Sequence, residues 1–168
     1  MARIADSFLA ELDQEAATTR RVLERVPNDK LGWKPHAKSM SLGQPALHVA
    51  TTPGQVAQLI TQDQFELPSF DQPSAGSAAE LVPALQESVA EAKQVLSTLD
   101  DQTAMSTWRL TKGGKDILAI PRIGVVRSIM LNHWYHHRGQ LSVYLRLLNV
   151  PVPSIYGPSA DEDPFATA

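Results

Sequence analysis

The stretch PRIGVVRSIMLNHWYHHRGQLSVYLRLLN, residues 121–149, decides the fold of this chain. Its apolar positions recur every three or four residues, which indicates a long amphipathic helix. Proline at position 121 suits the first turn of such a helix, because its φ angle is already fixed. Pro151 and Pro153 follow Asn149 and prevent the helix from continuing. We therefore predict a helix from about residue 121 to residue 148.

Two histidines lie on the stripe of this helix that we predict to be buried. The stripe consists of Val126, Met130, His133, His137, Leu141, Tyr144 and Leu148. Imidazoles at positions i and i+4 project from one face of a helix, close enough for one metal ion to bind both. A hydrogen bond to a carbonyl or a hydroxyl group is the alternative explanation for a buried histidine, so this pair does not decide between them.

Three more helices are predicted upstream, at about 4–26, 42–61 and 78–99, from the same periodicity. The polar segment 62–76 reads as a loop, and the paired glycines within 103–120 indicate a short β-hairpin. Pro53 lies inside the second helix and cannot donate a hydrogen bond to the carbonyl of residue 49. Four long helices in fewer than 150 residues predict an all-α four-helix bundle with a short β-hairpin before the last helix.

A third histidine, His48, lies on the second predicted helix. Packed helices are about 8–10 Å apart, so three imidazoles from two helices can meet. We predict that His48, His133 and His137 bind a divalent metal ion with at least one position open, as in catalytic sites. Imidazole ligands suit Zn²⁺, Ni²⁺, Fe²⁺ and Cu²⁺.

Several other polar residues are candidates for the site. His136 is three residues from His133 and is expected behind the ligands or on the surface. Gln140 and Tyr144 continue the stripe, so they either orient a ligand or bond within the bundle. Arg138 either holds an anionic substrate or forms an ion pair at the surface or with the tail. His36 is expected in a solvated loop.

The composition excludes several classes of function. The 168 residues contain 15 basic and 18 acidic side chains, a net charge of −3, which argues against nucleic-acid binding. Cysteine is absent, which removes disulfides, thiolate ligands and cysteine nucleophiles. Trp134 stands where the H-E-x-x-H motif of metalloproteases needs glutamate. No segment reads as a signal peptide or a membrane span, so we expect a cytoplasmic protein that does not bind membranes.

The sequence divides into a bundle domain, residues 1–150, and an extended C-terminal tail, residues 151–168. The run from Asn132 to Leu141, NHWYHHRGQL, resembles the last-helix signature of the DinB/YfiT-like family of metal-dependent enzymes. The resemblance continues to Pro158 and includes LGWKP at 31–35 and the lone His48 followed by Pro53-Gly54.

This resemblance implies an up-down-down-up bundle, a homodimer, and a divalent metal, with Zn²⁺ or Ni²⁺ expected first. The family's three ligands match His48, His133 and His137. It also implies a thiol-dependent S-transferase or a hydrolase that acts on a small electrophilic molecule. Since the chain has no cysteine, a low-molecular-weight thiol would be an external cosubstrate.

The alternative is a non-catalytic, metal-binding, stress-associated dimeric scaffold or sensor. Leu131, Trp134, Leu145 and Leu148 outline a second apolar face on the last helix. This face either binds a partner or packs against the other helices of the bundle.

Overall fold

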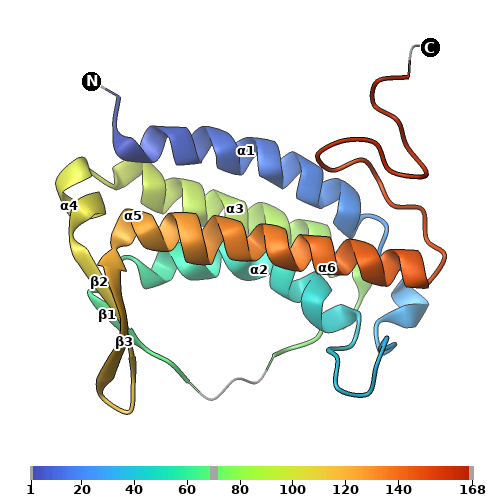
Figure 1. Ribbon diagram of the computed structural model, residues 1–168, viewed down its shortest axis with the longest axis horizontal. Helices are drawn as coiled ribbons and strands as arrows, with labels where there is room; N and C mark the ends of the chain where they lie inside the picture. Colours follow the sequence, from blue (N-terminus) through green and yellow to red (C-terminus); the bar gives the residue numbers. More distant parts are fainter. Residues whose placement is uncertain (1, 69–71, 167–168) are drawn as a thin grey trace.

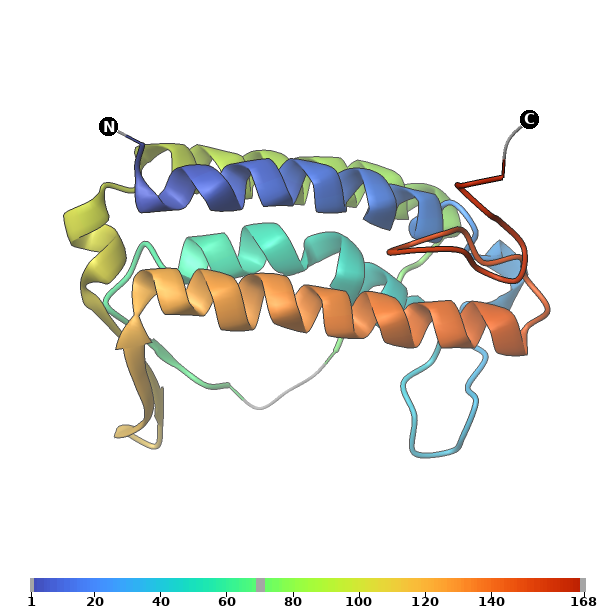
Figure 2. The same ribbon diagram turned by 45° about the horizontal axis from the view of Figure 1, so that its top comes forward.

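Four long helices lie side by side in the computed structural model, which describes residues 2–68 and 72–166 (Figure 1). The helices are α1 (Ile4–Leu23), α2 (Gly43–Leu59), α3 (Leu81–Thr98) and α6 (His133–Leu147). The chain runs in one direction through α1 and α6 and in the opposite direction through α2 and α3 (Figures 1 and 2). This arrangement confirms the predicted up-down-down-up bundle. In the part of the chain that the structure describes, no helix is long and apolar enough to span a membrane.

The helix boundaries differ from the predictions for local reasons. Helix α1 ends at Leu23 rather than at residue 26. Pro27 disfavours helical geometry at residue 26, the position directly before it. A single 3₁₀ turn, η1 (Asn28–Lys30), follows in the connection to α2. A second one, η2 (Ala78–Glu80), precedes α3.

The predicted β-hairpin is present and belongs to a three-stranded sheet. Strands β2 (Thr107–Lys112) and β3 (Lys115–Pro121) pair antiparallel, and Gly113 and Gly114 have φ angles of +59° and +72° in the turn. Positive φ at both central residues is typical of tight hairpin turns and favours glycine. The short helix α4 (Asp101–Met105) precedes the hairpin and was not predicted.

The prediction of a loop over residues 62–76 was wrong for three residues, while positions 69–71 of that segment lie outside the described residues. Strand β1 (Gln64–Glu66) pairs parallel with β2, so that Phe65 aligns with Leu110. Three residues are too few to show a period in the sequence, and this strand exists because the edge of β2 offers it hydrogen bonds.

The predicted last helix is observed as three helical segments in sequence. Helix α5 (Arg122–Val125) leads into a π-helical segment, η3 (Val126–Asn132), which is followed by α6. A π turn inserts a residue and rotates the side chains that follow. The fully buried positions of α6 are therefore Trp134, Arg138, Leu141 and Leu145, whereas His133 and His137 are half-buried beside them.

A hydrogen bond from α6 occupies the carbonyl that Pro53 leaves free in α2. The indole Nε1 of buried Trp134 donates to the Val49 carbonyl at 2.7 Å. In a regular helix the amide of residue 53 would donate to this oxygen, but proline has no N–H. Most of the predicted second apolar face of the last helix thus packs within the bundle, because Leu131, Trp134 and Leu145 are fully buried, whereas Leu148 is half-buried.

The carbonyl end of α2 is bound by side chains from the sheet and from α5. Trp108 Nε1 donates to the Leu59 carbonyl at 3.0 Å, and buried Arg122 donates to the carbonyls of Ile60 and Gln62. The last carbonyls of a helix have no partner within it, so these donors satisfy groups that would otherwise be unpaired. They also fasten the sheet to α2.

The C-terminal tail packs against α1 and α6. Asp161 pairs with Arg146 of α6, and Glu162 pairs with Arg21 of α1. Further along the bundle, the Tyr156 hydroxyl lies 2.6 Å from the guanidinium of Arg138. Residues 151–166 form neither helix nor strand and are held against the bundle by these contacts.

We predict that Trp134→Phe destabilises the protein by about 1–3 kcal/mol, because the buried Val49 carbonyl loses its donor. In a Pro53→Ala background the new amide at position 53 can donate to this carbonyl, so the same substitution costs less. Chemical denaturation of the four proteins of this double-mutant cycle measures the difference. An equal cost in both backgrounds would contradict the role assigned to Pro53.

Candidate metal centre

Three histidines from two helices meet in the interior of the bundle. His48 comes from α2, and His133 and His137 come from α6. One ring nitrogen of each lies within 4.8 Å of those of the other two. The ring centroids are 5.0 Å apart for His48 and His133, 4.5 Å for His48 and His137, and 4.4 Å for His133 and His137. The structure thus brings together the three residues that the sequence singled out.

The hydrogen bonds of these rings indicate where their protons are. Gln140 Oε1 lies 2.8 Å from His137 Nδ1 and can only accept, which places the proton of His137 on Nδ1. His137 Nε2 therefore carries a lone pair, and it lies 2.7 Å from His133 Nε2. His48 Nε2 is buried and has no hydrogen-bond partner among the described residues. Buried polar atoms without a partner are rare in folded proteins and call for an explanation.

The surroundings disfavour protonation of all three rings. Burial is the main cause that lowers the pKa of His48 from its ordinary value of 6.5 to about 4, and the neighbouring His137 and His133 lower it further. Burial also lowers the pKa of His133 and of His137. The rings are thus neutral near pH 7, which is the form that binds metal ions.

This donor set fits a divalent metal ion. Three neutral imidazoles are the ligands of one class of catalytic zinc site, in which a further position stays open. Ligating histidines commonly donate their other ring N–H to an acceptor, as His137 does to Gln140. An ion bound among the rings would also give the unpaired Nε2 of His48 a partner.

The remaining candidates lie at different distances from the trio. Gln140 contacts His137 directly, whereas Tyr144 bonds weakly to the Met40 carbonyl at 3.4 Å and packs edge-on against Trp33. His136 is exposed, with its ring centroid 5.0 Å from that of His137. His36 is exposed and accepts a hydrogen bond from the Lys38 amide.

Arg138 does not face the histidines. Its side chain is 1% exposed and pairs with Glu15 of α1, which is 7% exposed, at 2.6 Å. It also donates to Thr19 Oγ1 at 3.0 Å, and Tyr156 of the tail completes the cluster. The guanidinium is therefore fully engaged with the bundle and the tail, and the structure does not place it where it could hold a substrate.

A cavity of about 650 Å³ leads to two of the three histidines. His48 and His133 contribute to its lining, together with side chains from α2, the sheet and η3. Its volume is within the range of about 300–1,000 Å³ that is typical of small-molecule sites. Phe65 and Leu67 of this lining were missed in the sequence, because the segment 62–76 was read as a loop.

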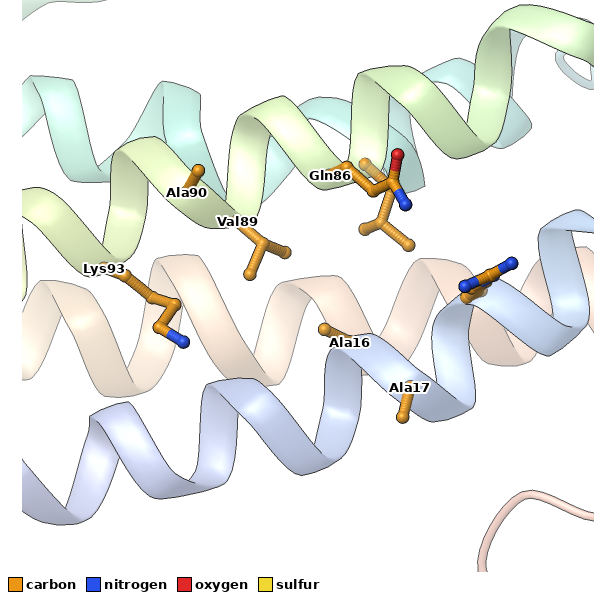
Figure 3. Close-up of a pocket in the computed structure, with 8 residues that line it drawn as sticks. Ala16, Ala17, Gln86, Val89, Ala90 and Lys93 are labelled. Atoms are coloured by element: carbon orange, nitrogen blue, oxygen red, sulfur yellow. The ribbon is translucent and has the colours of Figure 1, made fainter.

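A second hollow lies between α1 and α3 and has a volume of about 340 Å³ (Figure 3). It is lined mainly by small and apolar side chains, among them Ala16, Val89 and Ala90, with Lys93 at one end. None of the three histidines contributes to it. The hollow is therefore separate from the histidine cluster.

Comparisons with known proteins identify chains that are similar to this one. The model of the DinB family matches residues 1–164. YrdA of Bacillus subtilis is 28% identical over 163 residues, which is 96% of this chain and 93% of YrdA.

Two solved structures share the fold. A DinB-like protein from Bacillus cereus superimposes with a TM-score of 0.70 at 22% identity, covering 89% of this chain and 95% of its own. The DinB-like protein YjoA from Bacillus subtilis gives a TM-score of 0.65 at 17% identity, covering 87% and 96%.

The lowered pKa values predict how the metal-free protein responds to pH. Since His48 binds its proton at about pH 4 when folded and at about pH 6.5 when unfolded, the unfolded state takes up more protons between these values. Stability is therefore full above pH 6.5 and falls as the pH decreases toward 4. Urea denaturation of the metal-free protein at pH 8 and pH 5 measures this loss, which His48→Leu should reduce. An unaltered pH dependence in His48→Leu would contradict the assignment.

Proposed function

The chain belongs to the DinB family, and on this basis we propose that it is a metal-dependent enzyme acting on a small electrophilic molecule. The observation that carries the proposal is the convergence of three neutral imidazoles, one with an unpaired buried nitrogen, beside a large cavity that two of them line. His48, His133 and His137 are the proposed ligands, and Zn²⁺ or Ni²⁺ is the proposed ion.

A bound divalent ion supplies Lewis-acid chemistry: it lowers the pKa of water or of a thiol, so that a nucleophile exists near neutral pH. The protein's own residues have supporting roles. Gln140 keeps the proton of His137 on Nδ1, which leaves Nε2 free as a ligand atom. Burial keeps the three rings neutral, and the cavity brings the electrophile beside His48 and His133.

We propose a displacement reaction as the overall chemistry. The oxygen of water or the sulfur of an external thiol forms a bond to the electrophilic centre. The nucleophile loses its proton to solvent, and the leaving group departs with the bonding electron pair. A thiol would have to come from outside, because the chain has no cysteine.

The non-catalytic alternative, a metal-binding scaffold or sensor, has less support. Such a protein needs no space beside the ion, yet a cavity of about 650 Å³ meets two of the three proposed ligands. The second apolar face of the last helix is also buried within the chain at Leu131, Trp134 and Leu145. The homodimer and the cytoplasmic location stay as predictions.

We predict about one transition-metal ion per chain, measured by elemental analysis after purification. Both His133→Ala and His137→Ala should abolish binding, because two imidazoles alone hold the ion weakly. Gln140→Leu should weaken affinity by about 10–100-fold, as is usual when the acceptor behind a ligating histidine is lost. His136→Ala, an exposed neighbour on the same helix, is the matched control. Full occupancy in either ligand variant would refute the site.

We further predict metal-dependent turnover of small electrophiles, such as alkyl halides or activated esters, in the presence of a thiol or of water alone. Product formation should stop when a chelator removes the ion and return when Zn²⁺ or Ni²⁺ is restored. His137→Ala should be inactive, and His136→Ala should retain activity. Metal binding without turnover of any electrophile in the panel would favour the scaffold instead.

A further inference from the structure

The cavity beside the histidines has walls made of apolar side chains. Val56 and Leu59 come from α2, Phe65 from β1, Leu67 from just beyond it, Leu110 from β2, and Ile129 from η3. All except Val56 are only half-buried in the folded chain, although each is apolar. Half-buried apolar side chains that converge on one cavity can bury more surface when a ligand enters. The walls are therefore suited to an apolar body of a ligand.

Charged groups are nearly absent from the cavity. Among its described lining residues, Glu91 of α3 is the sole carboxylate and no lysine or arginine is present. Arg122, a buried cation on α5, is occupied by backbone carbonyls and by Asp63. An anionic substituent held among the apolar walls, away from the histidines, would thus lose its hydration without meeting a lysine or an arginine, which is unfavourable. Phosphorylated and carboxylated molecules are disfavoured for this reason.

Polar groups gather along one side of the cavity. His48, Thr52 and Gln55 follow each other along α2 at steps of four and three residues, so they share one face of that helix. His133 faces the same space from α6. A ligand in the cavity therefore meets the polar atoms of these four side chains as well as the apolar walls.

From these features we infer that the cavity binds the electrophilic substrate and that this substrate is an uncharged molecule with an apolar, alkyl or aromatic body. This inference rests on the proposed function, because it takes the reacting end of the molecule to lie beside His48 and His133. Common thiol cosubstrates carry carboxylates, so the same lining disfavours the cavity as their binding site. Leu110 and Phe65, which pair across β1 and β2, determine the specificity for the apolar body.

A pair of fluorescent probes tests the cavity without metal. N-phenyl-1-naphthylamine is uncharged, and 1-anilinonaphthalene-8-sulfonate has the same aromatic body with a sulfonate. The full chain should bind the uncharged probe at least about tenfold more tightly, because the sulfonate would be buried without a cation. Leu110→Asp should weaken binding of the uncharged probe by at least about tenfold, for the same reason. Phe65→Ala, which removes apolar wall without adding charge, should weaken it less.

Ile117→Asp is the matched control, since Ile117 lies on the neighbouring strand β3, is 50% exposed, and does not line the cavity. Its affinity for the uncharged probe should equal that of the parent chain. Circular dichroism of each variant verifies folding. The inference would be overturned if the parent chain bound both probes equally, or if neither Leu110→Asp nor Phe65→Ala lost affinity for the uncharged probe.

Metal-binding probes test the connection between cavity and ion. In protein loaded with Zn²⁺, hydroxamic acids from acetohydroxamic to hexanohydroxamic acid should bind about fourfold more tightly for each added CH₂ group. Adipic monohydroxamic acid, which ends in a carboxylate, should lose this gain. Binding that is independent of chain length, in protein that takes up Zn²⁺, would overturn the inference and leave the proposed function intact. Failure to take up Zn²⁺ would refute the proposed function. The fluorescent probes would still test whether the cavity binds uncharged apolar molecules.

Discussion

The contact between Trp134 and the Val49 carbonyl sets the relation between the two helices that carry the histidines. Pro53 removes the amide that would normally occupy this carbonyl, so α2 contains an acceptor that only another element can satisfy. Trp134 supplies the donor at 2.7 Å. Val49 is adjacent to His48, and Trp134 is adjacent to His133. This buried hydrogen bond therefore fixes the position of α6 along α2. Each of its two residues is next in sequence to one of the three histidines.

The same break in α2 allows a close approach on its other side. Gly54 donates its amide to Ser88 Oγ of α3 at 2.8 Å, and the Ser88 hydroxyl donates to the Thr51 carbonyl at 3.0 Å. A Cβ atom on residue 54 would lie 2.9 Å from the backbone of Ser88, so a larger residue would force the helices apart. Beyond Gly54, Trp108 and Arg122 bind the last carbonyls of α2. Helix α2 is thus held at its middle by α3 and α6 and at its end by the sheet, and the cavity lies between these contacts.

Much of this arrangement could be predicted from local sequence patterns. The four helices follow from periodicity, the hairpin follows from Gly113 and Gly114, and the meeting of His48 with His133 and His137 follows from helical spacing in a bundle. The prediction failed where the backbone departs from regular geometry. The π-helical segment η3 rotates α6, so Arg138 is buried where the simple period placed His137. A sequence period cannot reveal such a turn, because an extra residue changes the phase without changing the composition.

Strand β1 illustrates a different limit. Gln64, Phe65 and Glu66 form a strand only because β2 lies beside them, and their sequence has no signal that distinguishes them from a loop. Glu66 then bonds the Thr111 hydroxyl, which helps hold the short strand in register. Part of the cavity wall depends on this pairing, since it brings Phe65 next to Leu110. The histidine cluster could be predicted from residue spacing within helices, whereas the cavity beside it depends on contacts between elements.

The distribution of donors on α6 explains why the histidine lone pairs stay free. The helix places its strong donors, the Trp134 indole and the Arg138 guanidinium, on the face that packs against other helices, and each finds acceptors there. Toward the trio the protein offers an acceptor, Gln140 Oε1, but no donor that would occupy His48 Nε2. A proton there would place a charge in a buried site beside two other imidazoles, which is why the pKa of His48 falls to about 4. Protons therefore compete poorly for these nitrogens at neutral pH, and a divalent cation, which can bind several lone pairs at once, is the ligand best matched to them.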